Sequence, residues 1–341
     1  MKLTRFAAMS QSYDEDLLRP SQGDFVGSDD RALPIIFRPP YNKPDIRLTP
    51  FESRDLNFES PERESNELDM KLKKFFAGDY IFFPRSIHLI IALLKYLKIG
   101  PDEELAIRKT FNNGYISSCV TSPIEHVCKW STDISNKTRA ILVIHEFGFP
   151  CEEALKLKEE AESLGIPLIE DCAWTMGAKH AGTELGKIGD YSFYSLPKIF
   201  PMQYGAILRA GKLFDKKSQN LSEGTEAGKE ELIRRCLAYY LPTLEESNEK
   251  RRMNWIYLAS LLGKIGFRPL NDLREGVYPA CLIVRTDDYG PWHDRLEDFG
   301  VESGRYYHEK AIFLPVHQNL SRVHLDYIFA VINGFLKGRS S

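Results

Sequence analysis

The pattern of hydrophobic and polar positions is typical of an α/β protein. Residues 139–146 (RAILVIHE) have a continuous apolar centre, which predicts a strand buried on both faces. Residues 152–164 carry apolar side chains at helical spacing, and residues 166–171 (IPLIED) form a second buried run. Two strands joined by a helix make a βαβ unit, so the pattern predicts a mainly parallel sheet with right-handed crossovers.

Further periodic segments lie on both sides of this unit. Before it, the pattern predicts helices over 68–76 and 86–98 and strands over 79–84, 105–109 and 127–130. After it, the pattern predicts strands over 190–196, 205–209 and 277–285 and helices over 251–265, 292–299 and 322–336. This order favours a large α/β domain followed by a smaller α+β C-terminal domain.

These segments predict three regions. Residues 1–65 are rich in proline and show little periodicity, so we expect an N-terminal extended arm that lies over the protein or a partner subunit, in preference to a disordered tail. Residues 66–215 are expected to form the large α/β domain. Residues 216–341 are expected to form the small C-terminal α+β domain.

Composition narrows the classes of function. The 341 residues include 45 Lys and Arg against 48 Asp and Glu, which gives a formal net charge of −3. A nearly neutral chain lacks the clustered cations that nucleic-acid binding needs, so no nucleic-acid partner is expected. The apolar runs are far shorter than a bilayer span, and the N-terminus turns polar before an apolar core develops, so we expect neither a membrane segment nor a signal peptide.

The cysteines indicate a reducing compartment. Six cysteines are spread along the chain without CxxC spacing, and several lie in apolar runs. We therefore expect buried, reduced thiols in a cytoplasmic protein without a zinc or other metal site.

Two ionisable residues lie at predicted strand ends, where open parallel sheets bind their ligands. Asp171 closes the strand IPLIED, and Lys198 follows the strand DYSFYSL after Pro197. Taken singly, Asp171 is more often a helix N-cap and Lys198 a solvated loop lysine. Together they fit pyridoxal phosphate (PLP), because a lysine forms a Schiff base with its aldehyde and a buried carboxylate holds its protonated pyridine nitrogen.

Other residues suit the remaining parts of that cofactor. Ser86 begins a predicted helix, and Ser192 or Ser195 precedes the lysine, so these hydroxyls are candidates for the phosphate. Tyr115 is a candidate for stacking on the pyridine ring. Singly, ordinary capping or core packing explains each of them better. His145 is more simply interpreted as a satisfied buried histidine, and no GxGxxG, P-loop, HExxH or GxSxG motif is present.

Several short sequence motifs, in the order in which they occur, resemble those of the DegT/DnrJ/EryC1/StrS family of PLP-dependent sugar aminotransferases. The matching words are VIHEFGFP (143–150), IPLIEDCAWTMGA (166–178), GTELGKIGDYSFYSLPK (182–198) and YGAILRAG (204–211). Residues 300–317, which include FLPVH, look like the family's C-terminal words, and residues 90–105 look like its first helix and following turn. The resemblance covers roughly residues 66–340 and is poor between 212 and 250. It implies the PLP-dependent aminotransferase fold (fold type I), with the cofactor bound in the large domain.

The resemblance also implies roles for individual residues. It makes Lys198 the Schiff-base lysine, Asp171 the partner of the pyridine nitrogen, and Tyr115 the stacking aromatic. It places Ser86 at the phosphate together with Ser192 or Ser195, a choice that the spacing to the lysine leaves open. The segment that faces the substrate in the family is represented here by Arg305, Tyr306, Tyr307 and His308, for which a polar surface loop is an equally good interpretation.

The chain departs from the family pattern at five places, one of which is Tyr204-Gly205-Ala206, where the family has an acidic residue followed by two glycines. Arg85 replaces a small glycine before the phosphate hydroxyl, where it adds a charge or remakes the site. Trp174 stands where the family has Gln or His, and Ile199 replaces the Asn after the lysine. The N-Y-R motif, which in the family reaches the neighbouring subunit, is not recognisable. With these changes the residues expected to bind the cofactor are still present, whereas the family's substrate is less well supported.

The sequence thus predicts an aminotransferase that uses PLP and moves an amino group, from glutamate as the expected donor, to a keto group of a sugar nucleotide or related metabolite. The family resemblance implies a homodimer. Two alternatives stay open. One is a degenerate homologue that acts as a regulatory or assembly partner, and the other is a PLP enzyme of a different reaction type.

Overall fold

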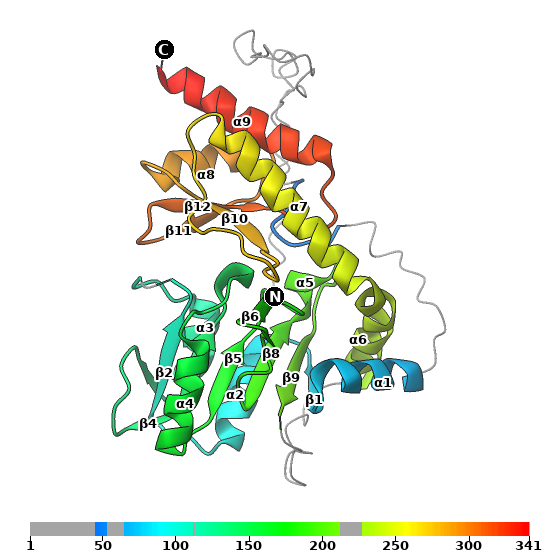
Figure 1. The fold of residues 1–341 in the computed structure, drawn as a ribbon, viewed down its shortest axis with the longest axis vertical. Helices are drawn as coiled ribbons and strands as arrows, with labels where there is room; N and C mark the ends of the chain where they lie inside the picture. The colour runs from blue at the N-terminus through cyan, green and yellow to red at the C-terminus, as the bar shows by residue number, and fades with distance from the viewer. Residues whose placement is uncertain (1–44, 53–64, 112, 212–226, 341) are drawn as a thin grey trace, which may run out of the picture.

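The structure is a computed structural model that describes residues 45–52, 65–111, 113–211 and 227–340. A seven-stranded sheet forms its centre, with the strand order β1-β9-β8-β5-β4-β2-β3 (Figure 1). These strands are β1 (Asp79–Phe83), β2 (Glu104–Lys109), β3 (Lys129–Ser131), β4 (Thr138–Ile144), β5 (Leu168–Asp171), β8 (Tyr191–Ser195) and β9 (Ala206–Ala210). All neighbouring pairs are parallel except the two that involve β9. The mainly parallel sheet predicted from the sequence is confirmed.

The register of the central strands sets the position of the site. Ile144 at the end of β4 pairs with Asp171 at the end of β5, and Asp171 pairs with Phe193 in β8. The helix between β4 and β5 is α4 (Ala154–Leu164), which ends at Gly165 in the left-handed conformation. The predicted βαβ unit is therefore present, and the carboxyl ends of β4, β5 and β8 lie side by side.

Helices cover both faces of this sheet. On one face, α2 (Ser86–Tyr96) and α3 (Ser118–Glu125) contribute Leu89, Leu93 and Ile124 to a common core with the strands. On the other face, the core contains residues of α1 (Ser65–Phe76), α4 and α6 (Ala227–Tyr240). The result is a three-layer α/β/α arrangement. A short hairpin of β6 (Lys179–His180) and β7 (Thr183–Glu184) precedes β8.

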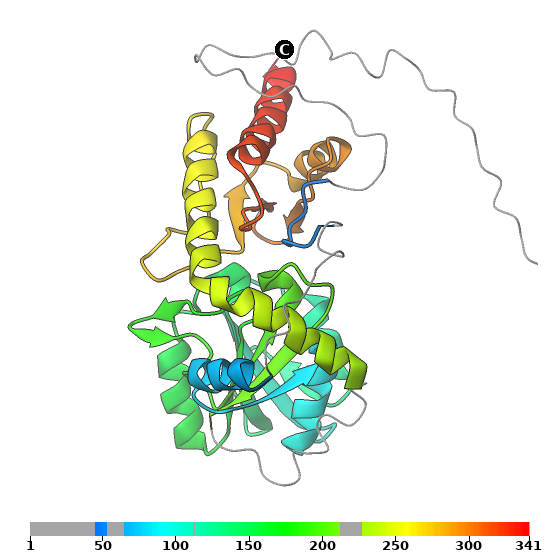
Figure 2. The same ribbon diagram turned by 90° about the vertical axis from the view of Figure 1, so that its right-hand side faces the viewer.

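The C-terminal part builds a second, smaller core. A three-stranded antiparallel sheet has the order β10-β12-β11, formed by β10 (Cys281–Arg285), β11 (Gly304–Tyr306) and β12 (Ala311–Pro315). It packs with residues of α7 (Leu244–Gly263), α8 (Tyr289–Asp298) and α9 (Arg322–Ser340). Figure 2 shows α6 against the large sheet and α7 rising from there beside the small one. Three short helical turns complete the fold, namely η3 (Glu146–Gly148), α5 (Leu196–Ile199) and η5 (Leu241–Thr243).

Residues 45–52 are the described part of the expected N-terminal arm, and most of that arm lies outside the described residues. Ile46 forms a parallel bridge with Val301 of the small domain. The carbonyl of Arg47 accepts a hydrogen bond from His317 Nε2 at 2.9 Å. This short segment therefore binds the small domain. The expected boundary between the two domains, at residues 215 and 216, also lies outside the described residues.

Several element bounds differ from those that periodicity predicts, for physical reasons. Helix α7 begins at Leu244 instead of 251, because its charged first half has little apolar pattern to reveal it. Strand β10 begins at Cys281 instead of 277, because the N–H of Ala280 donates to the carbonyl of Phe147 and not to a strand. Strand β11 has three residues, too few to show a clear period, and the five-residue β12 (AIFLP) was not predicted as a strand although it is apolar.

The turn before β8 generates a prediction about stability. Gly186 has φ +89°, and a Cβ there would lie 1.8 Å from Tyr194 Oη, whereas Gly182 has φ +84° and no heavy atom within 4 Å of such a Cβ. Both Gly→Ala changes impose the left-handed backbone cost, but only Gly186→Ala also overpacks the core. We expect Gly186→Ala to lose about 1–3 kcal/mol of unfolding free energy beyond the loss in Gly182→Ala, measured by urea denaturation. Equal losses in the two variants would contradict the packing seen around Tyr194.

Candidate active site

Asp171 provides a buried carboxylate at the centre of the sheet edge. It is the last residue of β5 and is 4% exposed. Its Oδ1 accepts a hydrogen bond from the N–H of Ala173 at 2.8 Å. Within the described part of the chain, its other oxygen has no hydrogen-bond partner, so it is available to accept a proton or hydrogen bond from a ligand.

Lys198 stands at the end of the neighbouring strand, in the short helix α5 that follows β8 directly. The residue is half-buried, and its Nζ lies 4.3 Å from the centre of the Trp174 ring. No carboxylate of the described residues forms an ion pair within 4.0 Å of this Nζ. The ammonium group is thus held by an aromatic face and by longer-range attraction to Asp171.

The two groups affect each other's ionisation. Burial raises the pKa of the Asp171 carboxyl and lowers the pKa of the Lys198 amine, and their mutual attraction opposes both shifts. A lysine with a lowered pKa carries more neutral amine near pH 7 than a surface lysine does. Such an amine is a candidate nucleophile toward an aldehyde or ketone.

A series of aromatic contacts begins at Trp174, beside Lys198, and reaches the small domain. Trp174 contacts Phe147, with 5.9 Å between ring centres, and Phe147 contacts Tyr306 at 5.5 Å. Tyr115 in turn contacts Tyr306 at 5.6 Å. Tyr115 is half-buried, and no hydrogen bond or cation–π contact joins it to Lys198, whose Nζ lies over the Trp174 ring. Trp174, and not Tyr115, is the ring next to the amine.

The start of α2 lies close to the lysine turn. The N–H of Gly205 donates to the carbonyl of Pro84, and the N–H of Leu196 donates to the carbonyl of Gly205, each at 2.9 Å. This glycine therefore stands between the N-terminus of α2, where Arg85 is exposed and Ser86 is half-buried, and the turn that carries Lys198. An anion at the N-terminus of α2 would lie near both.

The structure separates the two candidate serines. Ser195 is the N-cap residue of α5 and is half-buried, so it belongs to the same sheet edge as Lys198. Ser192 is fully buried, and its hydroxyl donates to the carbonyl of Gly186 at 2.8 Å. The structure therefore brings Ser195 to the other candidates and engages Ser192 elsewhere, a distinction that spacing alone did not make.

The remaining candidates lie on the small domain. Arg305 in β11 forms an ion pair with Asp294 at 2.7 Å. Tyr307 is 44% exposed, and its ring centre lies 5.8 Å from that of Tyr115. His308 has a left-handed backbone, with φ 71°. Of these residues, Tyr307 contacts the Tyr115 ring, whereas the Arg305 side chain forms its ion pair with Asp294.

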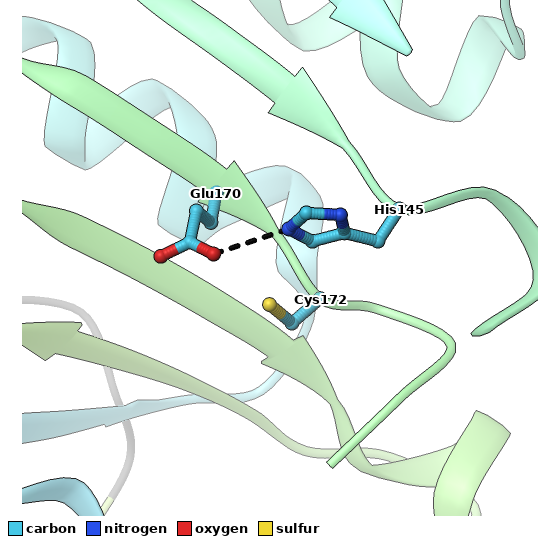
Figure 3. A group of neighbouring side chains, drawn as sticks. All are labelled: His145, Glu170 and Cys172. Atoms are coloured by element: carbon cyan, nitrogen blue, oxygen red, sulfur yellow. Dashed lines mark hydrogen bonds and ion pairs between the residues drawn. The ribbon is translucent and has the colours of Figure 1, made fainter. Parts of the chain in front are cut away.

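His145, Glu170 and Cys172 form a buried group at the ends of β4 and β5 (Figure 3). His145 Nδ1 accepts from the N–H of Cys151, so its Nε2 carries the proton that it shares with Glu170 Oε2 at 3.1 Å. Glu170 also accepts from the N–H groups of Gly186 and Gly189, at 2.8 and 2.6 Å. These bonds satisfy the carboxylate and tie the turn before β8 to the ends of β4 and β5.

The three donor atoms of that group lie within 4.8 Å of one another, close enough to hold a metal ion. Burial raises the pKa of the Cys172 thiol well above its ordinary value, which leaves it protonated and a poor ligand. The hydrogen bonds of Glu170 and His145 favour a structural role. The expectation of a chain without a metal site stays a prediction.

Sequence reasoning missed a second polar group at the ends of β2 and β4. Glu146 is buried and accepts from Tyr306 Oη at 3.1 Å and from the N–H of Phe111 at 2.9 Å. Lys109 Nζ lies 3.5 Å from the same carboxylate. The signal was present, because Glu146 follows a buried strand as Asp171 does. This group joins the large domain to β11 next to Tyr115.

The cysteines are described in full and are all free. Cys128, Cys151, Cys172 and Cys281 are buried as expected, whereas Cys119 is exposed in the first turn of α3. Among the described residues, no helix has the length and hydropathy needed to cross a membrane.

Comparison with known proteins places these features in a family context. The model of the DegT/DnrJ/EryC1/StrS aminotransferase family matches residues 126–209, a stretch that contains His145, Asp171 and Lys198. GDP-perosamine synthase from Escherichia coli O157:H7 is 26% identical over 204 residues, which cover 54% of this chain and 54% of that protein. The chain spans only 38% to 54% of the length of the first curated relatives that it matches.

Solved structures extend the similarity to the whole fold. The aminotransferase TlmJ from Streptoalloteichus hindustanus superposes with a TM-score of 0.69 at 17% identity, covering 84% of this chain and 94% of that chain. A Streptococcus pneumoniae protein, described as a sugar aminotransferase and solved in its PLP form, superposes with a TM-score of 0.65 at 16% identity, covering 87% and 100%. At these identities the superpositions establish a shared fold. The resemblance of this chain to the DegT/DnrJ/EryC1/StrS aminotransferase family is therefore confirmed, by the sequence match over residues 126–209 and by the fold around it.

Proposed function

We propose that this chain is a PLP-dependent aminotransferase that acts on a keto group of a sugar nucleotide or related metabolite, with glutamate as the amino donor. The observation that carries the proposal is the placement of Asp171 and Lys198 at the ends of adjacent strands, together with the family match that spans both. The relatives named above support a sugar-type substrate. A homodimer and a cytoplasmic location are parts of the proposal that rest on the family resemblance and on the free cysteines.

The residues at this sheet edge fit the cofactor. When bound, PLP supplies an aldehyde that condenses with a lysine amine and a ring that withdraws electrons from the reacting carbon. The free oxygen of Asp171 would accept the hydrogen bond of a protonated pyridine nitrogen, and the N-terminus of α2 with Ser86, Arg85 and Ser195 would hold the phosphate. Trp174 would provide the aromatic face next to the ring, with Tyr115 further out.

Lys198 then has two tasks. Its lowered pKa favours the neutral amine that takes up the cofactor, and once released the same amine can move a proton at the substrate carbon. The exposed Tyr307, with Arg305 and His308 beside it, is proposed to contact the substrate. Tyr115, which touches Tyr307, connects this surface to the site.

One observation favours a second candidate, a family member without transaminase activity. The Trp174 ring occupies the space over the Lys198 amine, where the family usually has Gln or His. If Trp174 prevents the cofactor ring from binding, the protein would keep the fold of the family but act as a regulatory or assembly partner. The two candidates differ in whether the purified chain takes up PLP.

The colour of the protein tests cofactor uptake. Protein incubated with PLP and desalted is expected to be yellow, and Lys198→Ala is expected to lose the visible absorbance because, among the described residues, Lys198 is the lysine whose charge acts on Asp171. Lys179→Ala, which removes an exposed lysine, is the control and should keep the absorbance. A colourless wild-type protein at saturating PLP would favour the second candidate.

The pH dependence of lysine reactivity tests the pair itself. In the cofactor-free protein, acylation of Lys198 should reach its half-maximal rate below pH 10.5, the ordinary lysine pKa, because burial lowers this pKa. The Asp171 charge raises the Lys198 pKa, so Asp171→Asn should move the profile further toward low pH. Mass-spectrometric quantification of the labelled peptide is the measurement, with the exposed Asp102→Asn as control. A profile that moves to higher pH, or not at all, would contradict the proposed pair.

The reaction is tested with a panel of keto-sugar nucleotides and glutamate. Transamination converts glutamate to 2-oxoglutarate, which a coupled dehydrogenase assay detects, and Lys198→Ala should lower the rate at least about a thousandfold, since it removes both the covalent and the proton-transfer group. Glutamine serves as the alternative donor in a parallel assay. A yellow protein that forms neither 2-oxoglutarate nor an aminated sugar across the panel would indicate a PLP enzyme of a different reaction type.

A further inference from the structure

The carbonyl end of the lysine turn faces a buried arginine from α7. Helix α5 has four residues, so it cannot satisfy its own last carbonyls. The Leu196 carbonyl accepts from the N–H of Phe200 at 2.8 Å. The Lys198 carbonyl accepts from Arg251 Nη2 at 3.2 Å, and the Ile199 carbonyl accepts from the same Nη2.

A second side chain completes this arrangement. Gln318 Nε2 donates to the Ile199 carbonyl at 2.9 Å, and Gln318 Oε1 accepts from Arg251 Nε at 2.7 Å. Arg251 and Gln318 therefore hold the lysine turn and each other. We call these two residues the α5 clamp.

The burial of the Arg251 side chain costs free energy, because a charged group loses its hydration. Arg251 is 2% exposed, and no carboxylate of the described residues forms an ion pair with it. Burial lowers its pKa to about 10, so the guanidinium remains charged at neutral pH. A buried cation without an anionic partner destabilises a fold unless hydrogen bonds and dipoles compensate it. Here the compensation comes from the carbonyl dipoles of the turn that carries Lys198.

The clamp belongs to the small domain, whereas Lys198 belongs to the large one. Arg251 lies on α7, which contributes Trp255 and Leu258 to the small core. Asn254, one turn further along α7, donates to the carbonyl of His317 at 3.0 Å, next to Gln318. Lys198 is thus held at its backbone from the small domain and at its tip by Trp174 of the large domain.

We propose that Arg251 and Gln318 are positioning residues that set the place of the Lys198 amine from the small domain. The docking of the small domain then controls how well the amine meets a cofactor aldehyde and a substrate carbon. This inference deepens the proposed function and rests on it for its catalytic consequence. Its structural part, a lysine turn held by the clamp, is testable without the cofactor.

The variants Arg251→Met, Arg251→Lys and Gln318→Met remove the clamp in whole or in part. Arg252→Met is the matched control, because the neighbouring Arg252 also donates to backbone carbonyls, those of Arg274 and Val277, which lie away from Lys198. Hydrogen–deuterium exchange of the cofactor-free proteins reports on residues 196–205, and PLP titration followed by visible absorbance reports on the amine. Residues 281–285 of β10 serve as an internal reference for general loosening.

We expect exchange over residues 196–205 to rise about fivefold in Arg251→Met and Gln318→Met, the effect of losing one net hydrogen bond, with the reference strand unchanged. Half-saturation with PLP should rise by about the same factor, and with an active wild type kcat should fall while KM for the keto substrate stays constant. Arg251→Lys keeps the charge but loses the guanidinium group that donates several hydrogen bonds, so its exchange and PLP half-saturation should lie between those of the wild type and Arg251→Met. Arg252→Met should match the wild type in both.

Three outcomes decide the proposal. Unchanged exchange and PLP uptake in folded Arg251→Met and Gln318→Met would overturn it, and so would an equal rise over residues 281–285, which would indicate general destabilisation. Should Arg251→Met not fold, Gln318→Met decides alone, because it removes an uncharged amide and leaves the Arg251 charge in place. A colourless wild type with raised exchange over residues 196–205 in the variants would support the clamp while the proposed function fails.

Discussion

The placement of Asp171 and Lys198 at the ends of two neighbouring parallel strands is the constraint on which the candidate site depends. Burial pushes both groups toward their neutral forms, and each one opposes that shift in the other. The pair exists only because β5 and β8 are parallel neighbours that end at the same edge of the sheet. The surrounding structure can be understood as the set of contacts that keep these two strand ends in register.

Two buried polar groups provide that support. In β5, Glu170 accepts hydrogen bonds from His145 and from two glycines of the turn before β8. From the small domain, the α5 clamp holds the carbonyls of the lysine turn. Because buried polar groups are costly unless satisfied, each group specifies one geometry of the backbone that it binds. The aromatic contacts from Trp174 to Tyr115 reach the small domain at Tyr306.

Much of the fold was predictable because its central strands are buried on both faces. Continuous apolar runs such as 139–146 identify parallel strands without reference to a partner, and the order strand, helix, strand then determines the crossover. The rule that parallel sheets bind ligands at strand ends selected Asp171 and Lys198 as candidates, and both residues do lie at the ends of adjacent strands. Glu146 obeys the same rule and was missed, since its neighbours in the sequence offer no matching group. Short strands such as β11 escaped because three residues show no period.

The sequence by itself determined the type of fold, the family resemblance and the pair of residues at the strand ends, since these follow from local hydrophobic periodicity and from the order of short words. Only the tertiary structure decided which hydroxyl shares the edge with Lys198. The Ser192 hydroxyl donates to the Gly186 carbonyl, whereas Ser195 stands at the N-cap position of α5 and its side chain makes no capping hydrogen bond. It also decided that Arg251, which looks like one more charged residue of a polar helix, is buried against the lysine turn. The physical reason is that contacts between residues 53 or more positions apart depend on how the two domains pack, and no local pattern encodes that packing.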